Sequence, residues 1–177
     1  MIYKDILQLG NPFLTKKSIP VKDFASPSLR LLVTDLIETM RFHDLVGISA
    51  SQIGKKQAIF VTEIRKTQYR NPKKHELLRV FINPQIVKFS KSESIQYEGC
   101  GSVAFGQLFG PVKRPQRVTI QAYDQNGKEF ILNADSLQSR VIQHEYDHLV
   151  GIEFTQKITD YSKMMSVNEY RKRILKA

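Results

Sequence analysis

The chain has 177 residues, of which 41% are hydrophobic and 25% charged, the composition of an ordinary globular protein. We expect one compact domain, residues 1–177, and no membrane partner, because no apolar run approaches the roughly 20 residues that span a bilayer. The first five residues lack the basic-then-apolar order of a secretion signal, so a cytoplasmic location is expected. The net charge of +10 favours an anionic partner such as a ribosome, although solubility alone would also explain it.

The N-terminal part of the chain is expected to form an extended arm followed by a buried helix. Residues 1–25 contain one glycine and two prolines and show little periodicity. Ser26-Pro27 is a typical helix start, because proline is favoured in the first turn after a capping residue. Six apolar residues then recur at helical spacing before the expected end near His43: Leu29, Leu32, Val33, Leu36, Ile37 and Met40.

The middle of the chain favours strands. A short apolar run predicts a strand over Gln57–Ile64, and Arg65–Glu76 is a polar and basic excursion. Asp124–Gly127 has the composition of a hairpin turn. The other expected strands are Leu77–Ile82 and Gln85–Phe89, separated by Asn83-Pro84, and Arg117–Tyr123 and Lys128–Leu132, on either side of the turn.

A second helix is predicted over Ser136–Leu149. Four of its residues share one stripe, at steps of four, three and four: Leu137, Val141, His144 and His148. The two histidines therefore continue a surface that faces the core. We predict the α+β class, with antiparallel strands packed around this central helix. The basic tail, residues 160–177, is expected to end as a C-terminal helix, which would be either a contact for a partner or a solvated surface.

The run from His144 to His148, His-Glu-Tyr-Asp-His, is the most informative motif. Two histidines four residues apart lie on one face of a helix and can bind the same ion. Glu145 would then lie beside that ion, close enough to take a proton from water. Cys100, the single cysteine, could supply a third ligand and leave a fourth position open, as a catalytic site requires. The alternative is a chance match of five residues.

Two further segments combine small residues with one functional side chain. Cys100 lies between Gly99 and Gly101, which lets the backbone approach a ligand and leaves the Gly101 amide free to face an oxyanion. Gly47–Gly54 is a run of small residues around Gln52, whose side chain offers an N–H to a polarised carbonyl. The alternatives are a small buried cysteine and a tight structural loop.

In this order, the three segments resemble the motifs of peptide deformylases. Gly47 to Gln52 matches the family's glycine-rich glutamine motif, Glu98 to Ser102 its cysteine motif, and Gln143 to Gly151 its Gln-His-Glu-x-Asp-His-Leu-x-Gly motif. The resemblance implies a hydrolase that removes the N-formyl group from the initiator methionine of nascent polypeptides and releases formate.

The resemblance also implies a metal centre. Cys100, His144 and His148 would bind one divalent ion, with Fe(II) expected as the native ion and Zn(II), Ni(II) or Co(II) as possible substitutes. Glu145 would act as the general base.

Further roles follow from the same resemblance. Gln52 and the Gly101 amide would stabilise the oxyanion. Glu98 would orient a ligand or a neighbouring basic group, unless it forms a surface salt bridge. The residues expected to bind the substrate are Val46, Gly47, Gly99 and Val141.

Several residues depart from the family's pattern. Ser49 and Ser51 stand where the first motif usually has alanine and often proline or threonine, and Leu45 replaces its usual first glycine. Gly101 replaces a usual leucine, and Val103–Phe109 is longer than the common bacterial form. Two rival functions stay open, the second of them because of these departures. One is a zinc peptidase, although its third ligand would normally be a histidine or a carboxylate. The other is a catalytically weak family member that binds ribosomes.

Overall fold

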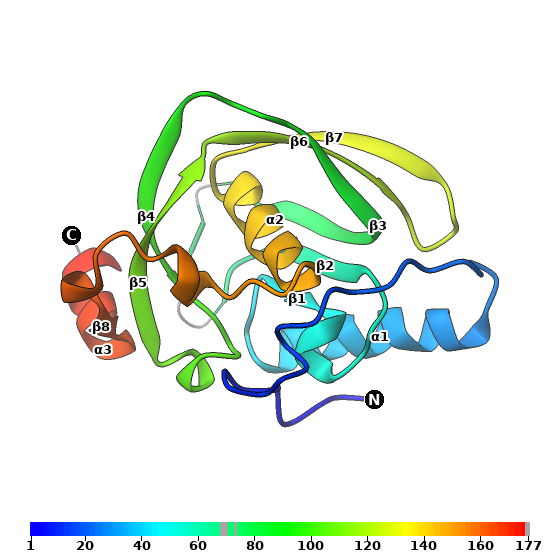
Figure 1. Ribbon diagram of the computed structural model, residues 1–177, viewed down its shortest axis with the longest axis horizontal. Coiled ribbons are helices and arrows are strands. Elements are labelled where there is room, and N and C mark those ends of the chain that lie inside the picture. Colours follow the sequence, from blue (N-terminus) through cyan, green and yellow to red (C-terminus); the bar gives the residue numbers. More distant parts are fainter. Residues whose placement is uncertain (68–70, 73, 176–177) are drawn as a thin grey trace.

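The computed structural model describes residues 1–67, 71–72 and 74–175. Two antiparallel sheets surround one central helix, α2 (Ser136–Leu149), and a second long helix, α1 (Pro27–Phe42), extends to one side (Figure 1). This arrangement confirms the predicted α+β class. None of the described helices combines the length and the apolar character that crossing a membrane requires.

The larger sheet has five strands, in the order β1-β2-β3-β6-β7. Their bounds are β1 Gly47–Ser49, β2 Ile59–Ile64, β3 Glu76–Phe89, β6 Arg117–Tyr123 and β7 Glu129–Asp135. The β6–β7 hairpin has the predicted turn. The Asp124 side chain closes that turn by accepting hydrogen bonds from the amides of Asn126 and Lys128, at 2.8 and 2.9 Å.

The expected break at Asn83-Pro84 is wrong, because β3 runs through it as one irregular strand. Asn83 has a φ of 50°, and the pairing of β3 with β6 shifts between Ile82 and Gln85. Proline has no N–H to give to the sheet, so a regular ladder is interrupted there. The Asn83 side chain instead ties down the N-terminal arm, with bonds to the amide and the carbonyl of Val21, both 2.8 Å long.

A second sheet, with the order β4-β5-β8, is absent from the sequence prediction. Its strands are β4 Glu93–Gly99, β5 Leu108–Pro115 and β8 Met165–Ser166. β5 was not predicted as a strand because it contains Pro111 and Pro115, and proline is rare inside strands. β4 nevertheless pairs with β5 along its whole length, with Gly99 opposite Phe109. Cys100 therefore directly follows the end of a paired strand.

Helix α1 lies close to its predicted bounds. Its expected buried residues include Leu36 and Met40, which are fully buried in the core that α1 shares with β1 and β2. Ser26 is the N-cap residue, but its hydroxyl contacts the Ser28 hydroxyl at 2.6 Å and does not cap the helix. At the other end, His43 anchors the arm through a 2.8 Å contact between its Nε2 and the carbonyl of Tyr3.

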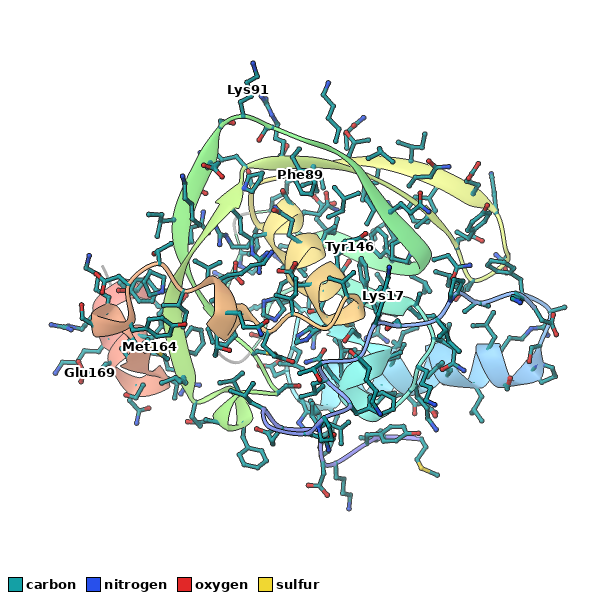
Figure 2. All side chains as sticks on the ribbon, viewed as in Figure 1. Lys17, Phe89, Lys91, Tyr146, Met164 and Glu169 are labelled. Atoms are coloured by element: carbon teal, nitrogen blue, oxygen red, sulfur yellow. The ribbon has the colours of Figure 1, made fainter. Side chains whose placement is uncertain are left out.

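The tail ends in the expected C-terminal helix, which is short and follows two other elements. A 3-10 turn over Tyr161–Lys163 leads into β8, and then into the short helix α3 (Val167–Tyr170), which continues as a π-helical turn over Arg171–Leu175. Because β8 pairs with β5, the tail is drawn against the second sheet. Met164 and Glu169 mark this end of the molecule in Figure 2, opposite the exposed end of α1.

Candidate active site

The three predicted ligand atoms converge at one point. His144 and His148 lie one turn apart on α2, and Cys100 approaches them from the end of β4. The candidate ligand atoms of these three residues all lie within 4.8 Å of one another, and Cys100 Sγ is 3.3 Å from His148 Nε2. One sulfur and two imidazoles with this spacing can hold a single tetrahedral ion and leave one position open.

The surroundings of Cys100 favour its thiolate. Burial would raise the pKa of the thiol, but the neighbouring His148 and His144 outweigh burial and lower this pKa to about 6. The amide of Ser102 and the side-chain amide of Gln52 both donate to Sγ, each at 3.4 Å. The thiolate is the form of cysteine that binds metals, so the site stabilises the species that a ligand role requires.

Glu98 contacts the His144 ring at Nδ1 and belongs to a buried network of charged side chains. Its Oε2 lies 3.0 Å from His144 Nδ1. Arg114 donates two hydrogen bonds to the same carboxylate, at 2.6 and 2.9 Å, and Arg140 donates another at 2.5 Å. Arg114 also donates to Asp147, at 2.7 Å. Burial opposes the charge of Glu98, but its partners outweigh burial and hold its pKa below the ordinary value. Glu98 therefore touches both a candidate ligand and basic groups, and it does not form a surface salt bridge.

Glu145 is buried beside the three ligand residues, and one of its oxygens has no partner among the described residues. Its side-chain Oε2 forms no hydrogen bond with the described residues. Its Oε1 lies against Gly47, where an added Cβ would be only 2.6 Å away, so the carboxylate can lie there only because residue 47 is glycine. Burial is the main reason that the pKa of Glu145 is raised to about 7. Such a pKa suits a proton acceptor that works near neutral pH.

Gln52 is held in place by the two serines that depart from the family's pattern. In the 3-10 turn Ala50–Ile53, Gln52 Oε1 accepts hydrogen bonds from the amide and the hydroxyl of Ser49, at 2.9 and 3.2 Å. The Ser49 hydroxyl also contacts the Ser51 hydroxyl at 2.9 Å. These contacts direct Nε2 of Gln52 toward Cys100. The two serines thus support the placement of the glutamine amide.

A cavity of about 340 Å³ opens onto this cluster, while His148 is buried behind it. The other predicted site residues all line the cavity: Val46, Gly47, Gln52, Glu98, Gly99, Cys100, Gly101, Val141, His144 and Glu145. The tail contributes Val167, Tyr170, Arg171 and Leu175. Tyr170 stacks on Phe109, with ring centroids 4.1 Å apart. The Phe109 ring in turn packs closely on Gly99, where an added Cβ would lie 2.7 Å from the ring. The cavity therefore extends from the ligand cluster to an aromatic wall formed partly by the tail.

The long segment after Ser102 forms part of the cavity rim. Ala104, Phe105 and Gly106 make a 3-10 turn in which all three φ angles are positive. This backbone region is unfavourable for the first two residues, because they carry a Cβ. The turn is held by a 2.9 Å hydrogen bond from the Phe105 amide to the Gln8 side chain, and the Phe105 ring is 71% exposed. The inserted residues thus shape the entrance to the cavity.

Several buried residues of the site were not predicted from the sequence; besides Arg114 and Asp147, they include Arg140 and Glu153. Arg140 lies one turn before His144 on α2 and contacts Glu98; its spacing of four residues was the available signal. Glu153 is buried, and its Oε1 lies 3.3 Å from His148 Nδ1. Its signal was a single acidic residue between two apolar ones, just past the last glycine of the motif.

Known proteins share this sequence and this fold. A family model described as polypeptide deformylase matches residues 3–164. A peptide deformylase from Treponema pallidum is 37% identical over 92% of both chains, and one from Roseiflexus castenholzii is 38% identical over 94% of both. A solved class I type b peptide deformylase from Acinetobacter baumannii has a TM-score of 0.84 at 26% identity, covering 90% of this chain and 100% of that one. A solved peptide deformylase from Ehrlichia chaffeensis has a TM-score of 0.79 at 31% identity, covering 92% and 90%. With most of its length matched in both sequence and structure, the chain belongs to the polypeptide deformylase family.

Proposed function

We propose a ligand set and a division of roles for the deformylation that family membership assigns to this chain. The chain is a hydrolase that removes the N-formyl group from nascent polypeptides. The proposed centre of this reaction is the cluster of Cys100, His144 and His148. The observation that carries the assignment is the convergence of three ligand atoms beside the buried carboxylate of Glu145.

A single divalent ion would be held by these three side chains, with Fe(II) as the native ion and Zn(II), Ni(II) or Co(II) as possible substitutes. One thiolate and two imidazoles suit all of these borderline ions. The unpartnered oxygen of Glu145 also supports a cation, because a buried carboxylate is unfavourable without a compensating charge. When bound, such an ion lowers the pKa of a water molecule and polarises a carbonyl oxygen.

The roles of the surrounding groups follow from their placement. Glu145 accepts a proton from the attacking water and delivers it to the leaving amine nitrogen. Gln52 Nε2 and the Gly101 amide donate to the formyl oxygen as it gains charge, and one such donor contributes about 3 kcal/mol. Gln52 Nε2 already faces the ligand cluster, because it donates to Cys100 Sγ at 3.4 Å and to the Ser102 hydroxyl at 3.1 Å.

The substrate would enter the cavity between β1 and the end of β4. Gly47 begins β1 and Val46 precedes it, Gly99 comes from the end of β4 and Val141 from α2, and all four line the cavity. The glycines leave room for a peptide backbone, and the valines provide an apolar surface for a methionine side chain. A class I type b peptide deformylase from Acinetobacter baumannii has been solved with Met-Ala-Ser bound, and we propose that a formylated peptide of this kind binds here.

Anaerobic purification followed by metal analysis and a formate-release assay on the same sample tests this function. We expect about one divalent ion per chain and formate release from formyl-Met-Ala-Ser, because the three ligands form a single site. Unformylated Met-Ala-Ser should remain intact. Cleavage of the peptide chain without formate release would favour the zinc peptidase, and an ion-loaded protein without hydrolysis would favour the catalytically weak member.

We further propose a cytoplasmic location and a ribosome contact through the basic tail, residues 160–177. Deleting the tail would be a poor test, because Tyr170 and its neighbours line the cavity. Replacing Lys172 and Arg173 by alanine removes two exposed charges and should weaken ribosome binding, most clearly at low salt. Turnover of a short formyl peptide should stay unchanged. Cosedimentation with ribosomes measures the first effect, and a kinetic assay measures the second.

The matched control replaces Lys88 and Lys91, two exposed lysines near the far end of β3, by alanine. This variant loses the same charge at a different place. An equal loss of ribosome binding in both variants would indicate general charge attraction. Unchanged binding in the tail variant would remove the tail as the contact.

A further inference from the structure

We propose that Glu153 is a positioning residue for His148. Its carboxylate lies 3.3 Å from Nδ1 without forming a hydrogen bond in this structure, and we propose that it accepts that bond when an ion is bound and so directs Nε2 toward the ion. The inference rests on the proposed metal centre. It concerns a residue that lies beyond the last of the three motifs, which ends at Gly151.

A tight turn after α2 brings Glu153 back to the helix. Gly151 has a φ of 77°, and a Cβ there would lie 2.3 Å from the carbonyl oxygen of Thr15, so this turn requires glycine. The chain then returns to the last turn of α2, where Glu153 Oε1 lies 3.3 Å from His148 Nδ1. The two side chains are 3% and 1% exposed, so the contact is shielded from water.

The two ring nitrogens of His148 face different partners. Nδ1 faces Glu153, and Nε2 faces Cys100 Sγ at 3.3 Å. An imidazole that donates its proton from Nδ1 presents the lone pair of Nε2 to an ion, and a carboxylate partner makes that lone pair more basic. His144 has the same kind of partner in Glu98. Each histidine of the cluster therefore has its own carboxylate.

The two carboxylates differ in how their charge is balanced. Glu98 is paired with Arg114 and Arg140. Within the part of the chain that the structure describes, no lysine or arginine forms an ion pair with Glu153. The Glu153 carboxylate is therefore free to interact with the His148 ring, and through that ring it would stabilise a bound ion. We expect its removal to weaken ion binding even though it is not a ligand itself.

The test compares Zn(II) binding by the wild type, Glu153→Gln and Glu153→Leu. Glutamine keeps the size and an acceptor oxygen but loses the charge, so we expect about 10-fold weaker binding. Leucine also removes the acceptor, and the loss should approach about 100-fold. Competition with a chelator gives the affinities, and the rate of Zn(II) loss should rise in the same order. In Co(II)-substituted protein, the thiolate-to-cobalt absorption bands should shift, because the freed ring changes the coordination geometry.

Gln156→Ala is the matched control. The Gln156 side chain accepts a 3.1 Å hydrogen bond from the Glu153 amide, so this variant weakens the same turn without touching His148. We expect Zn(II) affinity close to that of the wild type, with circular dichroism confirming that every variant is folded. Unchanged affinity in both Glu153 variants would overturn the proposal, as would a loss in Gln156→Ala equal to that in Glu153→Leu.

These measurements need no substrate. A wild-type protein that binds Zn(II) but releases no formate would contradict the proposed function and leave the role of Glu153 standing. Conversely, an active enzyme whose Glu153 variants retain the ion as firmly as the wild type would contradict the role of Glu153 alone.

Discussion

Glu145→Gln is expected to lower kcat for formate release by about 10²- to 10⁴-fold, the usual contribution of a general base. Glutamine has nearly the same size, so it fits against Gly47, but it cannot accept a proton from water. Cys100, His144 and His148 are untouched, and metal analysis should therefore find the ion content unchanged. Steady-state kinetics on formyl-Met-Ala-Ser measure the loss.

The pH profile sharpens this test. A carboxyl group works as a base only when deprotonated, so wild-type kcat/KM should fall about tenfold per pH unit below the pKa of Glu145. Burial raises that pKa to about 7 in the protein without an ion, and a bound cation lowers it by favouring the carboxylate. The acid limb of the loaded enzyme should therefore lie below pH 7, and Glu145→Gln should lack it. Glu129→Gln, at an exposed carboxylate on β7, serves as the control. Near-normal turnover in Glu145→Gln would rule out Glu145 as the base.

Cys100→Ala is expected to lose both the ion and the activity. The thiolate is the one anionic ligand of the proposed set, and without it two neutral imidazoles remain, too few for stable binding. After dialysis, metal analysis should find almost no ion, and formate release should drop to background.

Val103→Ala provides the comparison for Cys100→Ala. Val103 is buried in the same group of hydrophobic core residues as Cys100, and its side chain cannot bind an ion. This variant should lose some stability through the cavity it creates but keep its metal. If Cys100→Ala retained a full equivalent of ion, another side chain would have to complete the ligand set, and the proposed centre would be wrong.

The parts of the fold that follow from local periodicity were predictable. The apolar stripe of α1, the helix carrying His144 and His148, and the turn at Asp124 all have strong signals within a few residues. The second sheet was missed because its signals are not local. β5 contains Gly110, Pro111 and Pro115, residues that usually mark loops, and its strand structure depends on pairing with β4.

The site shows the same division between local and distant signals. The convergence of Cys100, His144 and His148 could be expected, because the two histidines lie in one short motif and the chain has a single cysteine. For Glu98, the sequence left a buried role and a surface salt bridge equally open, because its arginine partners lie 16 and 42 positions away. Glu153 was not predicted because its contact with His148 depends on the turn at Gly151. The periodicity of the sequence does not predict where the chain goes after that turn.

The aromatic wall has a consequence for the design of inhibitors. The segment matched by the family model ends at residue 164, whereas Val167, Tyr170 and Leu175 line the cavity beyond it. A compound anchored at the ligand cluster would contact residues of the three motifs. A compound that extends to the stacked rings of Tyr170 and Phe109 would also contact side chains beyond the matched segment. Reaching that wall would add an aromatic contact that the ligand cluster itself does not offer.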